Sequence, residues 1–113
     1  MSTPFDDMSM LDRLVHEPSR LIILTALTSC RSCDFLFMQS ITHISKGNLS
    51  NHLQKLEEGG LVEIEKGYKG RVPRTTLRVT AKGRAALERH RRRLEALRAA
   101  AKEGRPRPNT QED

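Results

Sequence analysis

Apolar residues in the first part of the chain recur at the spacing of helices. Leu11, Leu14 and Val15 fit one short helix. Pro18 then stands where the first turn of a new helix tolerates proline, and residues 21–29 are apolar on most sides. The pattern therefore predicts a short first helix and a second helix that lies in the centre of the core.

Two more helices follow, each preceded by a residue that can cap it. Asp34 is a suitable N-cap for a third helix that ends near Thr42, and Ser45 for a fourth helix over about residues 46–58. Apolar residues of the fourth helix fall at i, i+4 and i+7, so they form one inward stripe. This stripe consists of Leu49, Leu53 and Leu56. A pair of glycines then ends the helix.

The pattern next changes to that of strands. Residues 61–66 and 75–79 predict two strands, and residues 67–73 predict a glycine-bounded loop between them. Together they form a hairpin with a basic tip. Thr80 can cap a long final helix that reaches about Lys102.

The order of these elements predicts a mainly α fold with a small β-hairpin (α+β), namely a winged helix-turn-helix with a long C-terminal dimerisation helix. A length of 113 residues suits a single domain. We place this domain at residues 9–103. A flexible N-terminus (residues 1–8) precedes it, and a disordered tail rich in proline and charge (residues 104–113) follows it.

Along the final helix, residues recur at spacings of three and four, as in a coiled-coil seam with one polar member. The seam consists of Leu87, His90, Leu94, Leu97 and Ala101. Two copies of the chain can pair along such a seam. We therefore expect a homodimer whose interface includes the first four of these residues.

The distribution of charge indicates an anionic partner. The chain holds 20 Lys and Arg against 14 Asp and Glu, a net charge of +6. Residues 66–93 hold 11 basic residues and a single acid, Glu88, and such a concentration attracts a polyphosphate. Neither a membrane-spanning apolar run nor a signal-peptide pattern is found, so we expect a cytoplasmic protein with no membrane partner.

The third and fourth helices, with the tight connection at residues 42–45, form a helix-turn-helix candidate whose second helix enters a major groove. The start of that helix carries small and amide side chains, which can hydrogen-bond base edges. These residues are Gly47, Asn48, Ser50 and Asn51. A polar solvent face would look the same, but the hairpin favours DNA, because Lys69, Arg71 and Arg74 can reach a backbone or minor groove.

Residues 47–87 resemble the recognition helix, wing and following helix of ArsR/MarR-like winged helix transcriptional regulators, and read GNLSNHLQKLEEGGLVEIEKGYKGRVPRTTLRVTAKGRAAL. Upstream, HEPSRLIILTAL is similar to the helix that opens these domains, so the resemblance covers about residues 10–100. It implies a dimer that binds a roughly palindromic site in double-stranded DNA. The candidate DNA-binding residues are Lys46, Asn48, Ser50, Asn51, His52, Gln54 and Lys55 on the helix, and Lys69, Arg71 and Arg74 on the wing.

The two cysteines, Cys30 and Cys33, form a C-x-x-C pair. Such a pair supplies half of a four-ligand zinc site, which His43 or a second subunit would have to complete. Metal-sensing members of the wider family carry a cysteine pair on the recognition helix, where this chain has none. We therefore predict no metal site and no cofactor. Structural thiols are the main interpretation of the pair, and a redox-sensing regulator is the alternative.

Two kinds of function fit these features. The first is a sequence-specific DNA-binding regulator, more often a repressor in this family, because a bare domain blocks polymerase by occupying a promoter. The second is a winged-helix protein-interaction module, which would carry acids or large apolar groups where this chain has amides and arginine. An enzyme is not expected, since no nucleophile, base and orienting residue form a set. The operator and any small-molecule effector stay open.

Overall fold

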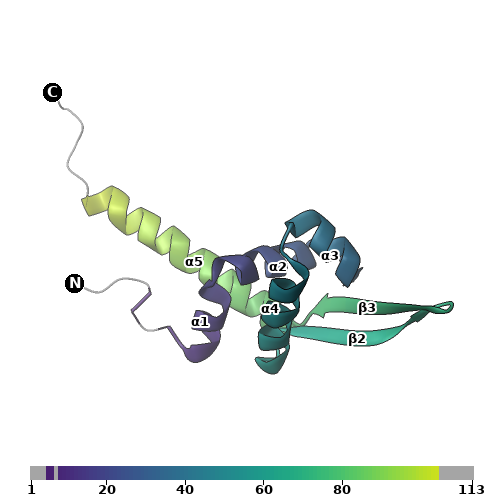
Figure 1. Cartoon of the computed structure of the whole chain (residues 1–113). Coiled ribbons are helices and arrows are strands. Elements are labelled where there is room, and N and C mark those ends of the chain that lie inside the picture. The colour runs from purple at the N-terminus through teal and green to yellow at the C-terminus, as the bar shows by residue number, and fades with distance from the viewer. Residues whose placement is uncertain (1–4, 7, 105–113) are drawn as a thin grey trace.

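Five helices and a three-stranded antiparallel sheet are formed by the residues that the computed structural model describes, 5–6 and 8–104. In chain order the elements are α1 (Met10–His16), α2 (Pro18–Thr28), β1 (Cys33–Asp34), α3 (Phe35–Thr42), α4 (Lys46–Glu58), β2 (Val62–Lys69), β3 (Val72–Val79) and α5 (Ala81–Gly104). Figure 1 shows α5 and the β2–β3 hairpin projecting from opposite sides of the helical body. The predicted mainly α fold with a small hairpin and a long final helix is confirmed.

Short polar side chains start the helices at the predicted positions. The Asp34 carboxylate accepts a hydrogen bond at 2.7 Å from the backbone N–H three residues further on. Ser45 Oγ and Thr80 Oγ1 accept the equivalent bonds at 3.3 Å and 3.0 Å. Each bond satisfies a backbone amide that has no partner inside its own helix. The three predicted caps are confirmed.

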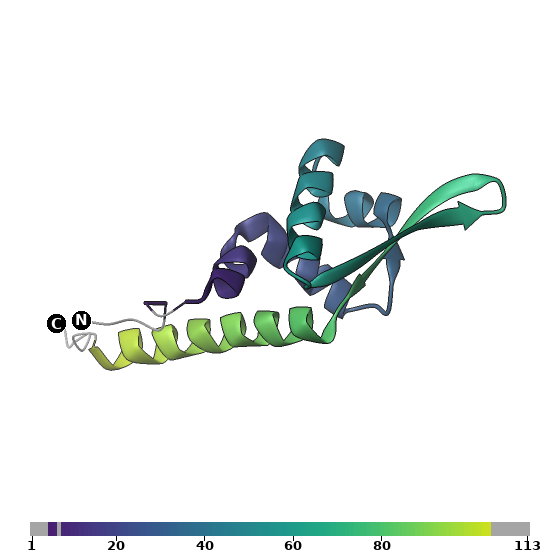
Figure 2. The same ribbon diagram turned by 90° about the horizontal axis from the view of Figure 1, so that it is seen from below.

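α2 is the central helix of the body, with α1, α3, α4 and α5 packed around it (Figure 2). Burial of aliphatic side chains between these helices and the base of the sheet is the main source of stability. The core residues are Val15, Ile23, Leu24, Leu27, Met38, Leu49, Leu53, Leu56, Leu61, Val62, Leu77 and Ala86. The predicted inward stripe of α4 belongs to this core.

The sheet has the strand order β1-β3-β2, and β2 and β3 form a long hairpin that pairs Lys69 with Val72 at its tip. A two-residue turn joins these strands. Gly70 has a φ of 64°, as the first central residue of a type II′ turn requires. β1 is a two-residue strand on the other side of β3, and no sequence pattern predicted it.

The predicted loop over residues 67–73 is wrong, because strand pairing continues through all of it except the turn. Gly67 and Pro73 suggested a loop, since both residue types weaken a strand inside a sheet. Here they lie on the outer part of the hairpin, where only two strands pair. Pro73 therefore lies on an open strand edge, where a missing N–H costs nothing. The strand predicted from Leu61 begins one residue later, at Val62.

α5 begins in close contact with the segment that leads into β2. A Cβ atom on Gly83 would clash with the Leu61 carbonyl oxygen and lie 2.8 Å from Val79 Cγ2. The same carbonyl accepts a hydrogen bond from Thr80 N at 3.0 Å. Although α5 has 24 residues, neither it nor any other described helix is apolar enough to cross a membrane. α5 ends at Gly104, and residues 105–113 of the predicted tail lie outside the described residues.

A buried charge cluster holds α1 on α5. The Asp12 side chain is 7% exposed, and its carboxylate pairs with Arg89 Nε at 3.0 Å and with Arg93 Nη2 at 2.7 Å. Burial on its own raises the pKa of Asp12. The hydrogen bonds from Arg89, Ser9 and Arg93 outweigh burial and lower this pKa to about 2. The carboxylate therefore stays charged at neutral pH.

Candidate nucleic-acid interface

α4 presents a polar face to solvent along its whole length. Its exposed residues include Lys46, Asn48, Ser50, Asn51, Gln54 and Lys55, all of them predicted contacts. The first turn is open, because a Cβ atom added to Gly47 would meet nothing within 4 Å. The same end carries the partial positive charge of the helix dipole. This face offers amide and hydroxyl groups to base edges and lysines to phosphates.

His52 is placed differently from the other predicted contacts, because its ring turns toward α2. The side chain is 16% exposed. Arg20 Nε donates a hydrogen bond to His52 Nδ1 at 3.2 Å, and Glu17 Oε2 lies 3.8 Å from His52 Nε2. Arg20 Nη1 also donates to the Leu14 carbonyl at 2.9 Å. Together these bonds join α4 to α2 and to the end of α1.

Sequence reasoning did not single out Arg20, which lies 32 residues before its partner in the chain. The sequence did contain a sign that the His52 side chain lies close to the core. His52 stands three residues after Leu49 and four before Leu56, so helix geometry places it beside the inward stripe.

We predict that Arg20→Ala lowers the free energy of unfolding by about 1–2 kcal/mol, because His52 Nδ1 and the Leu14 carbonyl both lose their donor. Urea denaturation followed by circular dichroism measures this. Arg13→Ala removes an exposed arginine from α1 and is the matched control. Equal free energies of unfolding in the two variants would mean that the Arg20 contacts do not help to hold α4 in position.

The predicted wing residues Lys69, Arg71 and Arg74 are all exposed on the hairpin. Arg71 occupies the turn at the tip. Arg74 Nε lies 3.8 Å from Oδ2 of Asp34, the residue that caps α3. The two side chains are 44% and 34% exposed, so water screens this ion pair and a phosphate can replace the carboxylate.

A trough separates α4 from the hairpin. It consists of two adjoining hollows that share Phe35, Lys46 and Thr75 in their lining. The charged and polar residues along it are Asp34, Lys46, Ser50, Gln54, Glu57, Lys66, Lys69 and Arg74. Cations outnumber acids in this lining. The structure thus brings three predicted residues of the helix beside two of the wing, around a space that suits a negatively charged backbone.

The cysteine pair lies at the connection from α2 to β1. Both thiols are free and partly buried. Burial, followed by the neighbouring Cys30, raises the pKa of Cys33 to about 12, so Cys33 is a thiol at neutral pH. Among the described residues, no three His, Cys, Asp or Glu side chains are grouped so that they could hold a metal ion, so His43 does not join the pair.

The residues of the predicted α5 seam lie in different environments in the structure. His90 is buried within the protomer at 5% exposure, and its ring packs against those of Phe5 and His16 at centroid distances of 6.0 Å and 5.3 Å. Burial, followed by the charges of His16 and Arg93, lowers the pKa of His90. Phe5 belongs to the N-terminal segment expected to be flexible, of which residues 1–4 and 7 lie outside the described part of the chain.

The leucines of the seam differ in exposure. Leu87 packs against the core, whereas Leu94 and Leu97 are 49% and 38% exposed. Leu94 also borders a groove between α2 and α5, together with Leu21 and Leu87. Exposed apolar surface on α5 therefore begins where the helix leaves the body.

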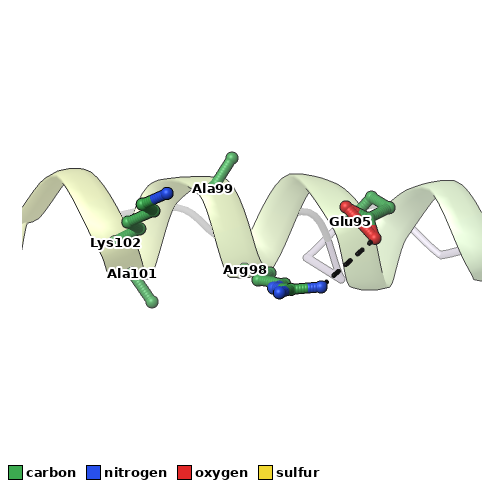
Figure 3. Close-up of a pocket in the computed structure, with 5 residues that line it drawn as sticks. All are labelled: Glu95, Arg98, Ala99, Ala101 and Lys102. Carbon is green, nitrogen blue, oxygen red and sulfur yellow. Dashed lines mark ion pairs between the residues drawn. The ribbon is translucent and has the colours of Figure 1, made fainter.

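The last turns of α5 carry a shallow hollow, shown in Figure 3. Its lining consists of Glu95, Arg98, Ala99, Ala101 and Lys102. Arg98 Nη1 pairs with Glu95 Oε1 at 3.9 Å, one helical turn away. Among the described residues the lining comes from a single helix, so the hollow has no opposing wall that would enclose a ligand.

The match to a known family spans most of these elements. Residues 19–98, from α2 into the outer half of α5, match the family described as winged helix DNA-binding domain. The chain belongs to this family. Helix α4, the β2–β3 hairpin and the trough between them all lie within the matched residues. The winged helix that the resemblance to ArsR/MarR-like regulators predicted is confirmed by this match.

Several known proteins are similar to this winged helix protein. The uncharacterized protein MJ0432 of Methanocaldococcus jannaschii is 40% identical over 77 residues, which cover 67% of this chain and 83% of that protein. A transcriptional regulator homologue from Pyrococcus horikoshii OT3 has a TM-score of 0.65 and 32% identity, covering 80% of this chain and 87% of the other. MarR has a TM-score of 0.67 at 21% identity, covering 84% and 69%, which is a likeness of fold alone.

Proposed function

We propose that this winged helix protein binds a specific site in double-stranded DNA as a homodimer and represses transcription by occupying a promoter. The observation that carries the proposal is the exposed polar face of α4, separated from a basic hairpin by a trough lined with more cations than acids. The action needs no catalysis. We also propose that the protein works in the cytoplasm.

In this proposal α4 enters a major groove. The amides of Asn48 and Asn51 pair with adenine edges, and Ser50 bonds to a neighbouring base. Lys46 and Lys55 contact phosphates on either side of the groove. The sequence is read by the amides and the hydroxyl, while the lysines set the position of the helix.

The wing lies on the backbone or in the adjacent minor groove. Lys69, Arg71 and Arg74 supply charge there, and Arg74 exchanges its screened ion pair with Asp34 for a phosphate. Arg71 lies in the turn that joins the two strands.

Two copies are proposed to pair through α5. Leu94 and Leu97 are the exposed apolar residues of the predicted seam, and the groove beside Leu94 can take apolar side chains of the partner. Two recognition helices related by a two-fold axis then read half-sites about one helical turn apart.

We predict that Arg71→Ala and Arg74→Ala each weaken binding to all duplex sequences and lower the slope of log K against log salt by about 1. Each substitution removes one phosphate contact and the counterion that this contact releases. Fluorescence anisotropy of a labelled duplex at several salt concentrations measures the slope. Arg13→Ala, on α1, is expected to leave it unchanged. An unchanged slope in the wing variants would remove these side chains from the interface.

The experiment that tests the proposed function is selection of duplexes from a random pool by the purified protein at physiological salt, followed by sequencing. A recovered palindrome would support a dimeric regulator and identify its operator. Binding without an enriched sequence would instead indicate a nonspecific DNA coater. No binding at all would favour the protein-interaction module.

A further inference from the structure

The tip of the wing carries apolar side chains that the charge-based account of DNA binding does not use. Tyr68 is the single tyrosine of the chain and is 75% exposed. Val72, on the other strand of the hairpin, is 66% exposed. Neither belongs to the core or packs against it. Figures 1 and 2 show the tip of the hairpin projecting beyond the helices of the body.

Strand register places the two side chains on opposite faces of the hairpin. Tyr68 pairs with Pro73, and Lys69 pairs with Val72. Paired residues share a face, and successive residues alternate between faces. One face of the tip therefore carries the side chains of Tyr68 and Pro73, and the other face carries those of Val72 and Lys69.

The Tyr68 face is continuous with the trough. Ile64 and Lys66 precede Tyr68 at steps of two residues, so all three share one face of β2. Both Ile64 and Lys66 line the trough between α4 and the hairpin. Tyr68 therefore extends the wall of this hollow outward, while Lys69 and Val72 of the other face line the adjoining hollow of the trough.

Charge decides which partner fits the tip. The apolar side chains stand among Lys66, Lys69, Arg71 and Arg74, and the outer part of the hairpin, residues 66–74, contains no acid. An apolar protein surface would leave these cations without partners. The minor groove of duplex DNA presents deoxyribose rings, which are apolar, bordered by phosphates, which pair with the cations.

We propose that the wing tip enters a minor groove with Tyr68 and Val72 against the deoxyribose rings of the two strands that border it. Arg71, at the turn between them, points to the groove floor. The proposal rests on the proposed DNA-binding function and assigns to Tyr68 and Val72 a contact that carries no charge. A minor groove about 6 Å wide is contacted on both sides by a tip that has apolar side chains on both faces.

This contact has a signature that separates it from the phosphate contacts. Apolar burial releases no counterion, so its loss weakens binding without changing the slope of log K against log salt. Loss of a wing cation changes both the affinity and the slope. Because the tip lies outside the core, substitutions there leave the fold intact, and thermal unfolding checks this.

The first test uses the single tyrosine as a probe. Protein labelled with 3-fluorotyrosine gives one fluorine resonance, from position 68, and this is followed as a mixed-sequence duplex is added to saturation. We expect the resonance to shift and broaden. Anisotropy of the same labelled duplex, measured in parallel, reports whether the protein has bound.

The second test compares affinities of full-length variants for the same duplex. Tyr68→Ser is expected to weaken binding about tenfold with an unchanged salt slope. Tyr68→Phe keeps the ring and retains nearly full affinity. Lys69→Ala lowers the slope by about 1. Met10→Ser replaces another exposed apolar residue, which lies on α1, far from the wing in sequence, and is the matched control with unchanged affinity.

The outcomes separate this proposal from the function on which it rests. If the duplex binds while the fluorine resonance stays in place and Tyr68→Ser binds like Met10→Ser, the tyrosine contact is overturned and the DNA-binding function stands. If the slope falls in Tyr68→Ser, the residue acts through charge positioning and the apolar contact is overturned. If anisotropy shows no binding, the proposed function itself fails.

Discussion

Leu94→Asp is expected to convert the proposed dimer into monomers. Leu94 is 49% exposed on α5 and borders the groove between α2 and α5, so a partner helix on the seam would bury it. A carboxylate there would lose its hydration without gaining a partner, and two copies would place like charges at the seam. Analytical ultracentrifugation is expected to show a single species of monomer mass at concentrations where the wild type is dimeric.

Loss of the dimer is expected to reduce DNA affinity as well. A monomer contacts one half-site and loses the effective concentration that links the two recognition helices, so affinity for a palindromic duplex falls about a hundredfold or more. Ala99→Asp adds the same charge to α5 away from the seam and is the matched control. If Leu94→Asp sediments as a dimer, the interface lies elsewhere on the molecule.

Gly83→Ala is expected to have the largest effect on stability. In an exposed helix the same change stabilises by up to about 1 kcal/mol, because alanine loses less backbone freedom on folding. Here the new Cβ atom would clash with the Leu61 carbonyl oxygen and crowd Val79. Since backbone cannot yield as a flexible side chain does, we expect a loss of about 3 kcal/mol in the free energy of unfolding.

Gly47→Ala is the control for this prediction, since Gly47 is also helical and an added Cβ atom there meets nothing within 4 Å. Urea denaturation of the two variants should give changes of opposite sign. A Gly83→Ala variant as stable as the wild type would show that α5 does not approach the Leu61 carbonyl so closely.

Much of the candidate interface was predictable because it depends on neighbours within one or two helical turns. Ser45 caps α4, and the spacing of Leu49, Leu53 and Leu56 directs the opposite face of the helix to solvent. Those two local features place Asn48 and Asn51 outside. The basic hairpin followed in the same way from two strand-like runs, although the segment between them was predicted as a loop and forms strand on both sides of the turn.

The sequence did not predict the environment of a residue that packs against a distant segment of the chain. His52 carried a polar side chain on a predicted DNA-binding helix, yet it is held by Arg20 of α2. His90 continued the seam spacing, yet the rings of Phe5 and His16 bury it inside the protomer. Heptad spacing identifies a face of a helix, and it does not say which neighbour covers that face.

The sequence by itself therefore determined the five helices, the caps of α3, α4 and α5 and the polar face of α4, since capping bonds and side-chain periodicity act over a few residues. Tertiary structure alone decided that strand pairing continues through residues 67–73, that Arg74 meets Asp34, and that Gly83 must be glycine. The physical reason is that these features depend on the distance between elements. Packing of the whole core sets that distance, and no local pattern contains it.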